Sequence, residues 1–353
     1  MKRQSLVAYG EPLQSTEIET PEPTGTEVLV RVTHCGVCHS DLHLHEGYFD
    51  LGDGKQLDVR ATRSLPFTFG HEIAGEVVAL GPEAGPEAAT GVEIGSRYAV
   101  YPWIGCGNCS RCHRGDEHLC EVQRHIGIYV DGGYATHVMV PHPRYLIDIT
   151  GIDPMLAGSY MCSGLTTYSA LKKTGAYLND GPLLILGMGG LGMMGLQFAR
   201  AMTDQPIVAA DISPQKRQAA LDLGATMAVD PTDKEARKAI FAQVGKISAV
   251  TDYVGTPETI NFAQSVVTRG SVIVVAGLMG GRFSMSSAMF GIKAMSLMGT
   301  YAGSLTEARD MIEMVRNGRI AKIPVDPRPL AAANQALEDL RDGRVTGRVV
   351  LTP

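Results

Sequence analysis

From about residue 181 onward, short apolar runs alternate with longer amphipathic runs along the chain. The apolar runs predict strands at 182–186, 206–211, 227–230, 249–253 and 271–276. The amphipathic runs between them predict helices at 190–203, 214–223, 232–244 and 257–268. Strand and helix in strict alternation predict a doubly wound parallel sheet, so this part of the chain belongs to the α/β class.

The first 150 residues have a different pattern. Residues 28–33 alternate apolar and polar side chains, residues 72–80 form an apolar run, and residues 6–9 resemble a third strand, while proline and glycine interrupt the chain throughout. We therefore expect a β-rich domain before the parallel sheet. A tail from about 293 to 353 carries a predicted helix at 306–317 and a closing strand at 348–351. Its sequence is compatible with membership of either domain.

Length and charge narrow the class of protein. A chain of 353 residues corresponds to roughly two domains at about 150 residues each. The net charge of −6 argues against nucleic acid or an anionic membrane as the main partner, and favours small molecules. The most apolar stretch, 183–199, contains five glycines and is too short for a membrane span. The N-terminus has no signal-peptide pattern, so we expect a cytoplasmic protein.

Four of the seven cysteines are clustered. Cys106, Cys109, Cys112 and Cys120 form a C-x2-C-x2-C-x7-C array, the spacing of a closed, all-thiolate structural zinc site. Iron–sulfur clusters use similar spacings and are the alternative. An odd number of cysteines in a chain without a secretion signal argues against a disulfide framework.

A second group of metal ligands is dispersed along the chain. Cys38 follows a predicted strand, His71 comes 33 residues later, and Cys162 begins the second half. Three protein ligands that leave one open position are typical of a catalytic zinc. Asp41 and Glu72 are carboxylates next to these ligands, suited to fix the tautomer of His71. Cys35 has no predicted role.

A glycine-rich turn follows the strand at 182–186. Gly187, Gly189 and Gly192 form a G-x-G-x-x-G motif between a strand and a helix, and Asp211 ends the next strand. This unit predicts a dinucleotide site with the pyrophosphate at the helix N-terminus and the ribose hydroxyls on the acid. Asp211 would repel a 2′-phosphate, which favours NAD over NADP, although Lys216 and Arg217 follow one turn later.

Together these motifs resemble the zinc-containing alcohol dehydrogenases of the medium-chain dehydrogenase/reductase family. The resemblance extends over nearly the whole chain and includes C-G-V-C-H-S-D-L-H at 35–43, G-H-E at 70–72, C-S-G-L-T-T-Y at 162–168, G-M-G-G-L-G at 187–192 and G-R-V-V-L at 347–351. It implies a GroES-like catalytic domain at 1–155, a Rossmann NAD-binding domain at 156–292, and a C-terminal return to the catalytic domain at 293–353.

The resemblance also implies roles for individual residues. Cys38, His71 and Cys162 would bind a catalytic zinc, with Glu72 as a transient ligand. Ser40 would hydrogen-bond the substrate hydroxyl, and His43 would complete a proton relay through the nicotinamide ribose. The coenzyme contacts would be His39, Thr166, Gly187, Gly189, Gly190, Leu191, Gly192, Asp211, Lys216 and Arg348.

The expected activity is the zinc- and NAD-dependent interconversion of primary or secondary alcohols with aldehydes or ketones. A polyol or amino-alcohol dehydrogenase of the same family is the alternative, although such enzymes typically carry glutamate in place of Cys162. A zinc- and nucleotide-binding protein without turnover is a second alternative. The stretch between Tyr48 and Phe69 looks longer than in compact relatives and predicts a reshaped pocket for bulky or aromatic alcohols, with Tyr48, Phe49 and Trp103 as candidate walls. Relatives of this length imply a homo-oligomer, a tetramer before a dimer.

Overall fold

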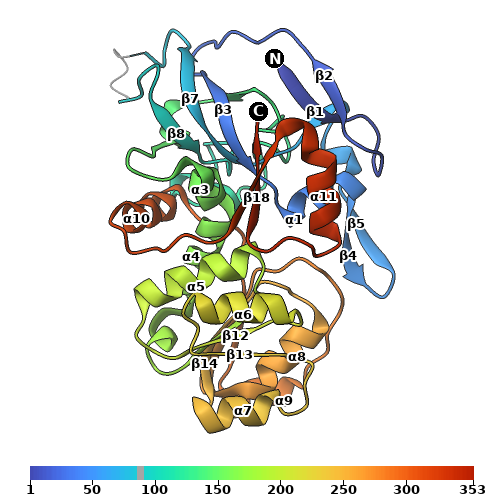
Figure 1. Cartoon of the computed structure of the whole chain (residues 1–353), viewed down its shortest axis with the longest axis vertical. Coiled ribbons are helices and arrows are strands. Elements are labelled where there is room, and N and C mark those ends of the chain that lie inside the picture. The colour runs from blue at the N-terminus through green and yellow to red at the C-terminus, as the bar shows by residue number, and fades with distance from the viewer. Residues whose placement is uncertain (86–90) are drawn as a thin grey trace.

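Two large sheets organise the computed structural model, which describes residues 1–85 and 91–353 (Figure 1). The first has seven strands, ordered β10-β8-β7-β3-β18-β17 with β9 also paired to β3. Its strands are β3 (Val28–Gly36), β7 (Glu72–Leu80), β8 (Arg97–Val100), β9 (His137–Val140), β10 (Leu146–Asp148), β17 (Val325–Pro329) and β18 (Arg348–Thr352). A three-stranded sheet of β1 (Lys2–Leu6), β2 (Gln14–Glu17) and β6 (Phe67–Thr68) accompanies it.

The second large sheet is parallel and has six strands, ordered β13-β12-β11-β14-β15-β16. Its strands are β11 (Leu183–Leu186), β12 (Ile207–Ala210), β13 (Met227–Val229), β14 (Ile247–Asp252), β15 (Val267–Val275) and β16 (Ser296–Gly299). All four residues of β11 are fully buried. Burying each of these leucine or isoleucine side chains contributes about 1.5–3 kcal/mol, so the central strand anchors this half of the molecule.

Helices cover both sheets. They are α1 (His39–Glu46), α2 (Ser110–His113), α3 (Pro154–Ser159), α4 (Leu165–Thr174), α5 (Gly190–Met202), α6 (Pro214–Asp222), α7 (Ala236–Gln243), α8 (Pro257–Val266), α9 (Ser287–Lys293), α10 (Leu305–Arg316) and α11 (Ala333–Arg341). The predicted alternation of strand and helix after residue 181 is confirmed, and so is the α/β fold class.

Several element bounds differ from the sequence prediction. The predicted helix at 257–268 ends at Val266, where β15 follows directly. Residues 6–9 do not form a strand: β1 ends at Leu6, because the chain turns towards Gly10, whose φ is +78°. Helix α7 begins at Ala236 instead of residue 232. The parallel sheet extends to Gly299, so its sixth strand, β16, lies beyond residue 292, where the sequence analysis ended the Rossmann domain.

The C-terminal strand returns to the N-terminal half of the molecule. Val350 and Leu351 of β18 pair antiparallel with Gly36 and Cys35 of β3. In Figure 1 the red β18 accordingly lies beside the blue β3, far along the chain but adjacent in space. Residues that follow β3 and residues near position 348 are therefore neighbours.

A hairpin that the sequence did not predict extends from α1. It consists of β4 (Tyr48–Gly52) and β5 (Lys55–Asp58). Asp53 and Gly54 form its tip, both with positive φ (53° and 72°), as a two-residue type I′ turn requires. The hairpin projects from the upper half towards the half that carries the parallel sheet (Figure 1).

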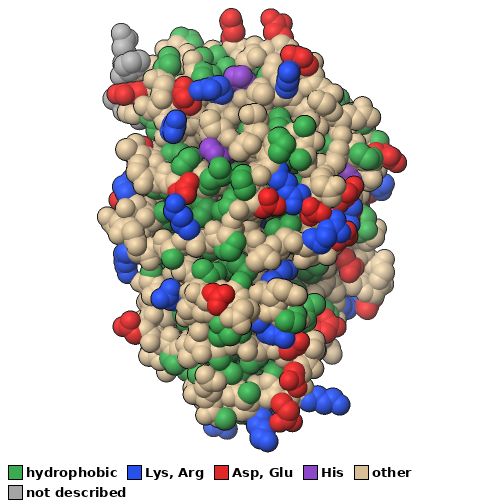
Figure 2. All heavy atoms as spheres, viewed as in Figure 1, with side chains coloured by type: hydrophobic (Ala, Val, Ile, Leu, Met, Phe, Trp, Pro, Cys, Tyr) green, Lys and Arg blue, Asp and Glu red, His purple; other side chains and the backbone are tan. Residues whose placement is uncertain are grey.

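The surface shows mixed charge. On the face drawn in Figure 2, basic and acidic side chains are interspersed instead of gathered into one patch of a single sign. No helix in the part of the chain that the structure describes is long and apolar enough to cross a bilayer.

Candidate active site

Cys38, His71, Glu72 and Cys162 meet in space, although they come from three separate segments of the chain. One ligand atom from each lies within 4.8 Å of all the others, and all four side chains are buried. Cys38 is the N-cap of α1, and Glu72 is the first residue of β7. Cys162 lies in a π-helical turn, Tyr160–Gly164, between α3 and α4, and such turns are frequent at functional sites.

Buried polar atoms without partners suit this group for a metal. Neither ring nitrogen of His71 forms a hydrogen bond, and Oε2 of Glu72 has none either. Leaving such atoms unpaired inside a protein is costly, so their convergence with two sulfur atoms indicates a ligand. Two thiolates and an imidazole are donors that Zn²⁺ prefers.

Asp41 lies beside the Nδ1 atom of His71. Its Oδ1 lies 3.4 Å from Nδ1 of His71, and both side chains are fully buried. Its Oδ2 accepts hydrogen bonds from the Cys38 amide and the Tyr134 hydroxyl, each 2.9 Å long. Burial alone would lower the pKa of His71, but Asp41 and Cys38 outweigh burial and raise that pKa well above its usual value. A carboxylate on one ring nitrogen leaves the other directed at the ligand position.

Glu72 is also paired with Arg348. The Arg348 guanidinium donates to Oε1 of Glu72, and both residues are buried. Burial raises the pKa of Glu72, and the nearby Arg348 charge opposes that shift. Arg348 also packs against Gly190, where an added Cβ would lie 2.3 Å from its Cδ. Arg348 therefore connects the buried ligand group with the glycine-rich turn.

The predicted relay residues lie on α1. The Oγ of Ser40 is 3.7 Å from the sulfur of Cys38. His43 follows three residues later, on the same side of the helix. His39 lies between Cys38 and Ser40 in sequence. Burial lowers the pKa of its imidazole, and the charges of Arg348, His43 and Lys216 lower that pKa further. Thr166 is buried in the first turn of α4, just after Cys162.

The glycine-rich turn has the shape of a phosphate site. An added Cβ at Gly192 would lie 1.8 Å from the carbonyl oxygen of Gly187, so this glycine closes the turn. At Gly189, the N-cap of α5, an added Cβ would meet nothing within 4 Å, so the helix N-terminus is open to a ligand, and Leu191 lies half-buried in its first turn.

Asp211 lies beside this turn. Its carboxylate accepts from the amides of Met188 (2.7 Å) and Ser213 (2.8 Å). Arg217, which follows one turn later, does not face an open position. Its guanidinium donates to the carbonyls of Asp211 and Ile212 and to Asp230. The sequence did not reveal these bonds, because neither backbone carbonyls nor Asp230 form a recognisable motif with Arg217.

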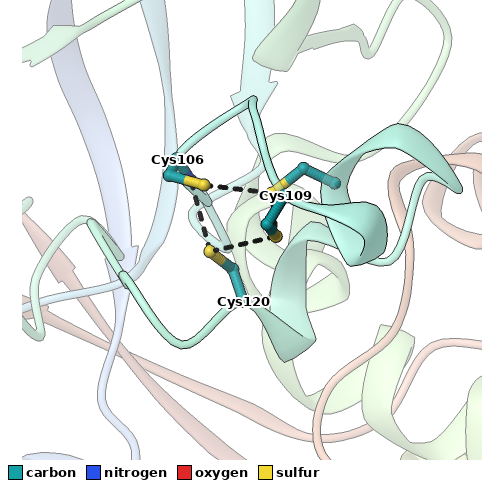
Figure 3. A group of neighbouring side chains, drawn as sticks. Cys106, Cys109 and Cys120 are labelled. Atoms are coloured by element: carbon teal, nitrogen blue, oxygen red, sulfur yellow. Dashed lines mark hydrogen bonds between the residues drawn. The ribbon is translucent and has the colours of Figure 1, made fainter.

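The four clustered cysteines converge in a separate lobe. Figure 3 shows three of them, Cys106, Cys109 and Cys120, with their sulfur atoms turned towards one another. The sulfur of Cys109 lies 3.5 Å from that of Cys112 and 3.8 Å from that of Cys120, and the sulfur atoms of Cys106 and Cys112 are 4.0 Å apart. Tetrahedral zinc with bonds of about 2.3 Å needs sulfur atoms about 3.8 Å apart, so the lobe fits a zinc ion. A hydrogen bond from the Asn108 amide lowers the pKa of Cys106 to about 6.

Comparisons with known proteins agree with this geometry. Residues 24–150 match the alcohol dehydrogenase GroES-like domain family, and residues 190–317 match the zinc-binding dehydrogenase family. An NAD-dependent alcohol dehydrogenase of Sulfurisphaera tokodaii is 32% identical over the full length of both chains. A D-arabinose 1-dehydrogenase (NADP⁺) of Saccharolobus solfataricus is 29% identical over 99% of this chain and 96% of its own.

Among solved structures, the alcohol dehydrogenase of Aeropyrum pernix is 27% identical, covers both chains completely and superposes with a TM-score of 0.88. The chain therefore belongs to the zinc-containing alcohol dehydrogenases of the medium-chain dehydrogenase/reductase family, which are oxidoreductases acting on CH–OH groups. The resemblance stated from the sequence is confirmed, as are the α/β fold with a GroES-like part and the use of zinc and NAD in this family.

Proposed function

We propose that the chain is a zinc- and NAD-dependent dehydrogenase that interconverts primary or secondary alcohols with aldehydes or ketones by hydride transfer. The convergence of Cys38, His71 and Cys162 carries this proposal: all three are buried, and Nε2 of His71 has no hydrogen-bond partner among the described residues. Such a set leaves one position for a substrate oxygen.

The proposed division of metals is one catalytic and one structural zinc. Cys38, His71 and Cys162 would hold the first. Glu72 would be a transient ligand, and it forms an ion pair with Arg348 when it does not bind the metal. Cys106, Cys109, Cys112 and Cys120 would hold the second, where four thiolates leave no open position. Zinc bound at the catalytic site acts as a Lewis acid that makes a bound hydroxyl more acidic.

The chain's own residues would move the proton. Oγ of Ser40 would accept the hydroxyl proton of the alcohol and release its own towards His43, with the nicotinamide ribose as the intermediate carrier. His43 would then pass the proton to solvent, which its half-exposed position supports. Burial lowers the pKa of His43, so the ring is neutral near pH 7 and able to accept a proton.

The coenzyme would lie along the glycine-rich turn. Its pyrophosphate would lie against Gly189, Gly190, Leu191 and the α5 N-terminus, with His39 and Arg348 as cationic or donor contacts. Gly187 and Gly192 would shape the turn, Thr166 would pack against the nicotinamide, and Lys216 would contact the adenosine ribose. Asp211 would bind the ribose hydroxyls. The occupied guanidinium of Arg217 supports NAD over NADP, because it is not free for a 2′-phosphate.

A polyol, sugar or amino-alcohol substrate is the second candidate, and the similarity to a D-arabinose 1-dehydrogenase supports it. Cys162 speaks against it, because such relatives typically use glutamate there. The hairpin of β4 and β5 accounts for part of the Tyr48–Phe69 stretch, and we propose that this stretch biases the pocket towards bulky or aromatic alcohols. Trp103 supports an aromatic wall, since its ring lies 5.7 Å from that of His71.

A substrate and metal survey tests these proposals. Primary, secondary and aromatic alcohols and polyols, each with NAD and NADP, should give reduced-nicotinamide absorbance fastest with a simple or aromatic alcohol and NAD. Metal analysis should give two zinc ions per chain. Both Cys38→Ser and Cys109→Ser should lower this to about one, but only Cys38→Ser should abolish turnover at 25 °C. Turnover by Cys38→Ser at the wild-type rate, or none by the wild type with any alcohol, would refute the assignment.

The remaining proposals concern organisation. We propose that the Rossmann domain begins at residue 156 and ends at about residue 300 instead of 292, so that it includes β16. The catalytic domain then comprises residues 1–155 and the residues after about 300. We also propose a cytoplasmic homo-oligomer, a tetramer before a dimer. The edge position of β16 in the parallel sheet and the exposed side chains of Phe290 and Ile292 in α9 support assembly. Light scattering during size exclusion tests it.

A further inference from the structure

The tip of the β4–β5 hairpin contacts the loop that follows β15, in the half of the molecule that carries the parallel sheet. Gly52 is buried although it lies next to the hairpin tip. An added Cβ at Gly52 would lie 2.6 Å from the amide nitrogen of Arg282 and 2.7 Å from the carbonyl carbon of Gly281. An added Cβ at Gly280 would lie 2.5 Å from the carbonyl oxygen of Asp50. The two backbones are therefore in direct contact, with no room for side chains.

An ion pair fastens this contact. Nη1 of Arg282 lies 2.9 Å from Oδ2 of Asp53, a hydrogen bond between residues 229 positions apart in the chain. Both side chains are more than half exposed, so salt screens their attraction. The strength of this ion pair therefore depends on the salt concentration.

The base of the hairpin contacts a relay residue. The ring of Phe49 lies 4.8 Å from that of His43, with the two planes inclined at 33°. The hairpin starts directly after Gly47, the C-cap of α1, whose amide donates to the carbonyl of His43. On the other side, the amide of Val59 donates to Gly47. Any shift of the hairpin therefore moves the ring that packs on His43.

The loop at the hairpin tip continues to the coenzyme turn. An added Cβ at Gly277 would lie 2.1 Å from the carbonyl carbon of Val254, and one at Gly255 would lie 2.2 Å from the carbonyl oxygen of Gly277. Cγ2 of Val254 in turn lies 2.5 Å from the Cβ position of Gly187. Close contacts thus run from the hairpin tip to the glycine-rich turn, through backbone atoms as far as Val254 and through the Val254 side chain at Gly187.

We propose that Phe49 is a positioning residue for His43, and that the Asp53–Arg282 ion pair holds it in place through the loop next to the coenzyme turn. This inference rests on the proposed role of His43 as the proton carrier. Phe49 restricts the imidazole to one orientation, and the hairpin maintains that orientation while its tip is docked. Proton release from the alcohol is thereby coupled to the placement of the coenzyme-binding half.

A double-mutant cycle tests the action through His43. The readout is the pre-steady-state rate of reduced-nicotinamide formation with saturating alcohol and NAD. Phe49→Ala should lower this rate about five- to 20-fold, less than the roughly 100- to 10,000-fold that a complete acid–base group supplies. Phe49→Tyr retains the ring and should keep the rate within about twofold of wild type. In a His43→Gln background, Phe49→Ala should have no further effect, because the residue that it positions is gone.

The ion pair is tested separately. Arg282→Ala should lower the same rate by roughly two- to fivefold, the range for an exposed pair. High salt should slow the wild type to the same rate and leave Arg282→Ala unchanged, because salt screens only the intact pair. Lys238→Ala is the matched control. Lys238 is an exposed cation that pairs with Glu235 at the start of α7, in the same half of the molecule as Arg282.

Several outcomes would overturn the inference. Equal effects of Phe49→Ala with and without His43 would show that the ring acts by another route, and a wild-type rate in Phe49→Ala would show that it does not act. A loss in Lys238→Ala equal to that in Arg282→Ala would remove the role of the ion pair. An inactive wild type refutes the proposed function instead, so the two failures are distinguishable.

Discussion

The carboxylate of Asp41 has three partners and no exposure to solvent. It accepts from the Cys38 amide and the Tyr134 hydroxyl and lies beside His71. Asp41→Asn keeps the size of the side chain but removes the charge that orients the imidazole. We expect the affinity for zinc at this site to fall about 10- to 100-fold. The measurement is the rate at which a chromophoric chelator extracts one zinc per chain.

The control for this prediction is Glu76→Gln, because Glu76 pairs with Arg31 at the surface, in the strand β7 that begins with Glu72. It should leave zinc release unchanged. If Asp41→Asn loses zinc no faster than Glu76→Gln, then Asp41 does not support His71 in the way that the geometry indicates.

Single residues were predictable from sequence where their chemistry is local or their spacing is specific. The four clustered cysteines are of this kind, and their side chains converge. Asp41, predicted to act on His71, lies 3.4 Å from its Nδ1. Tyr134 and Arg217 were not predictable. Tyr134 is 93 residues from Asp41, and Arg217 uses backbone carbonyls, so no pattern of residue types indicates either contact.

At the scale of elements, two glycines in the turn between β11 and α5 have different roles, one in folding and one in coenzyme binding, and substitutions can distinguish them. Gly192→Ala would place Cβ 1.8 Å from the carbonyl oxygen of Gly187, so we expect both a lower melting temperature and a loss of coenzyme affinity. Gly189→Ala meets no protein atom within 4 Å and has ordinary φ of −77°. We expect it to keep the melting temperature and to weaken NADH binding alone, by about tenfold.

Thermal unfolding and NADH fluorescence titration check this pair of predictions. Coenzyme affinity at the wild-type level in Gly189→Ala would mean that the pyrophosphate does not approach this position. An unchanged melting temperature in Gly192→Ala would contradict the close approach that the turn shows.

Elements with a strong periodic pattern were predicted well, and those held by distant backbone contacts were not. The strand at 72–80 has the predicted bounds because it is apolar along most of its length. The β4–β5 hairpin combines apolar residues with Asp50, Gly52 and Lys55 and shows no period of two. Its tip is stabilised by Gly281 and Arg282, so only the folded chain reveals why it forms.

The whole molecule is joined by contacts between its two halves near the ligand group. His125, before β9, is fully buried, and Tyr301, after β16, lies with its hydroxyl 3.5 Å from Nδ1 of His125. Trp103 packs edge-on against both rings, at 5.3 and 5.4 Å. The ring of Tyr129 lies edge-on to the imidazole, with the two ring centres 5.6 Å apart. Because these neighbours are uncharged rings, the imidazole is enclosed without an acidic partner among the described residues that contact it.

Burial of His125 makes the stability of the whole chain depend on pH. Burial, with smaller contributions from His118 and His71, lowers the pKa of His125 to about 3, against about 6.5 in an unfolded chain. Between pH 6.5 and about pH 3 the unfolded state binds a proton at His125 and the native state does not. The free energy of unfolding therefore falls by about 1.4 kcal/mol per pH unit over this range. The stability from this group is fully present above pH 6.5.

Comparison with His125→Asn isolates this contribution from carboxylates and metal ligands that titrate in both proteins. The variant should be less stable at pH 7.5, because it loses the ring packing, but its stability should fall less on acidification. Between pH 7.5 and pH 5 we expect the wild type to lose about 2 kcal/mol more than the variant. Urea unfolding at matched zinc and coenzyme concentrations measures the difference. Parallel losses in the two proteins would show that His125 titrates normally and that the halves do not enclose it.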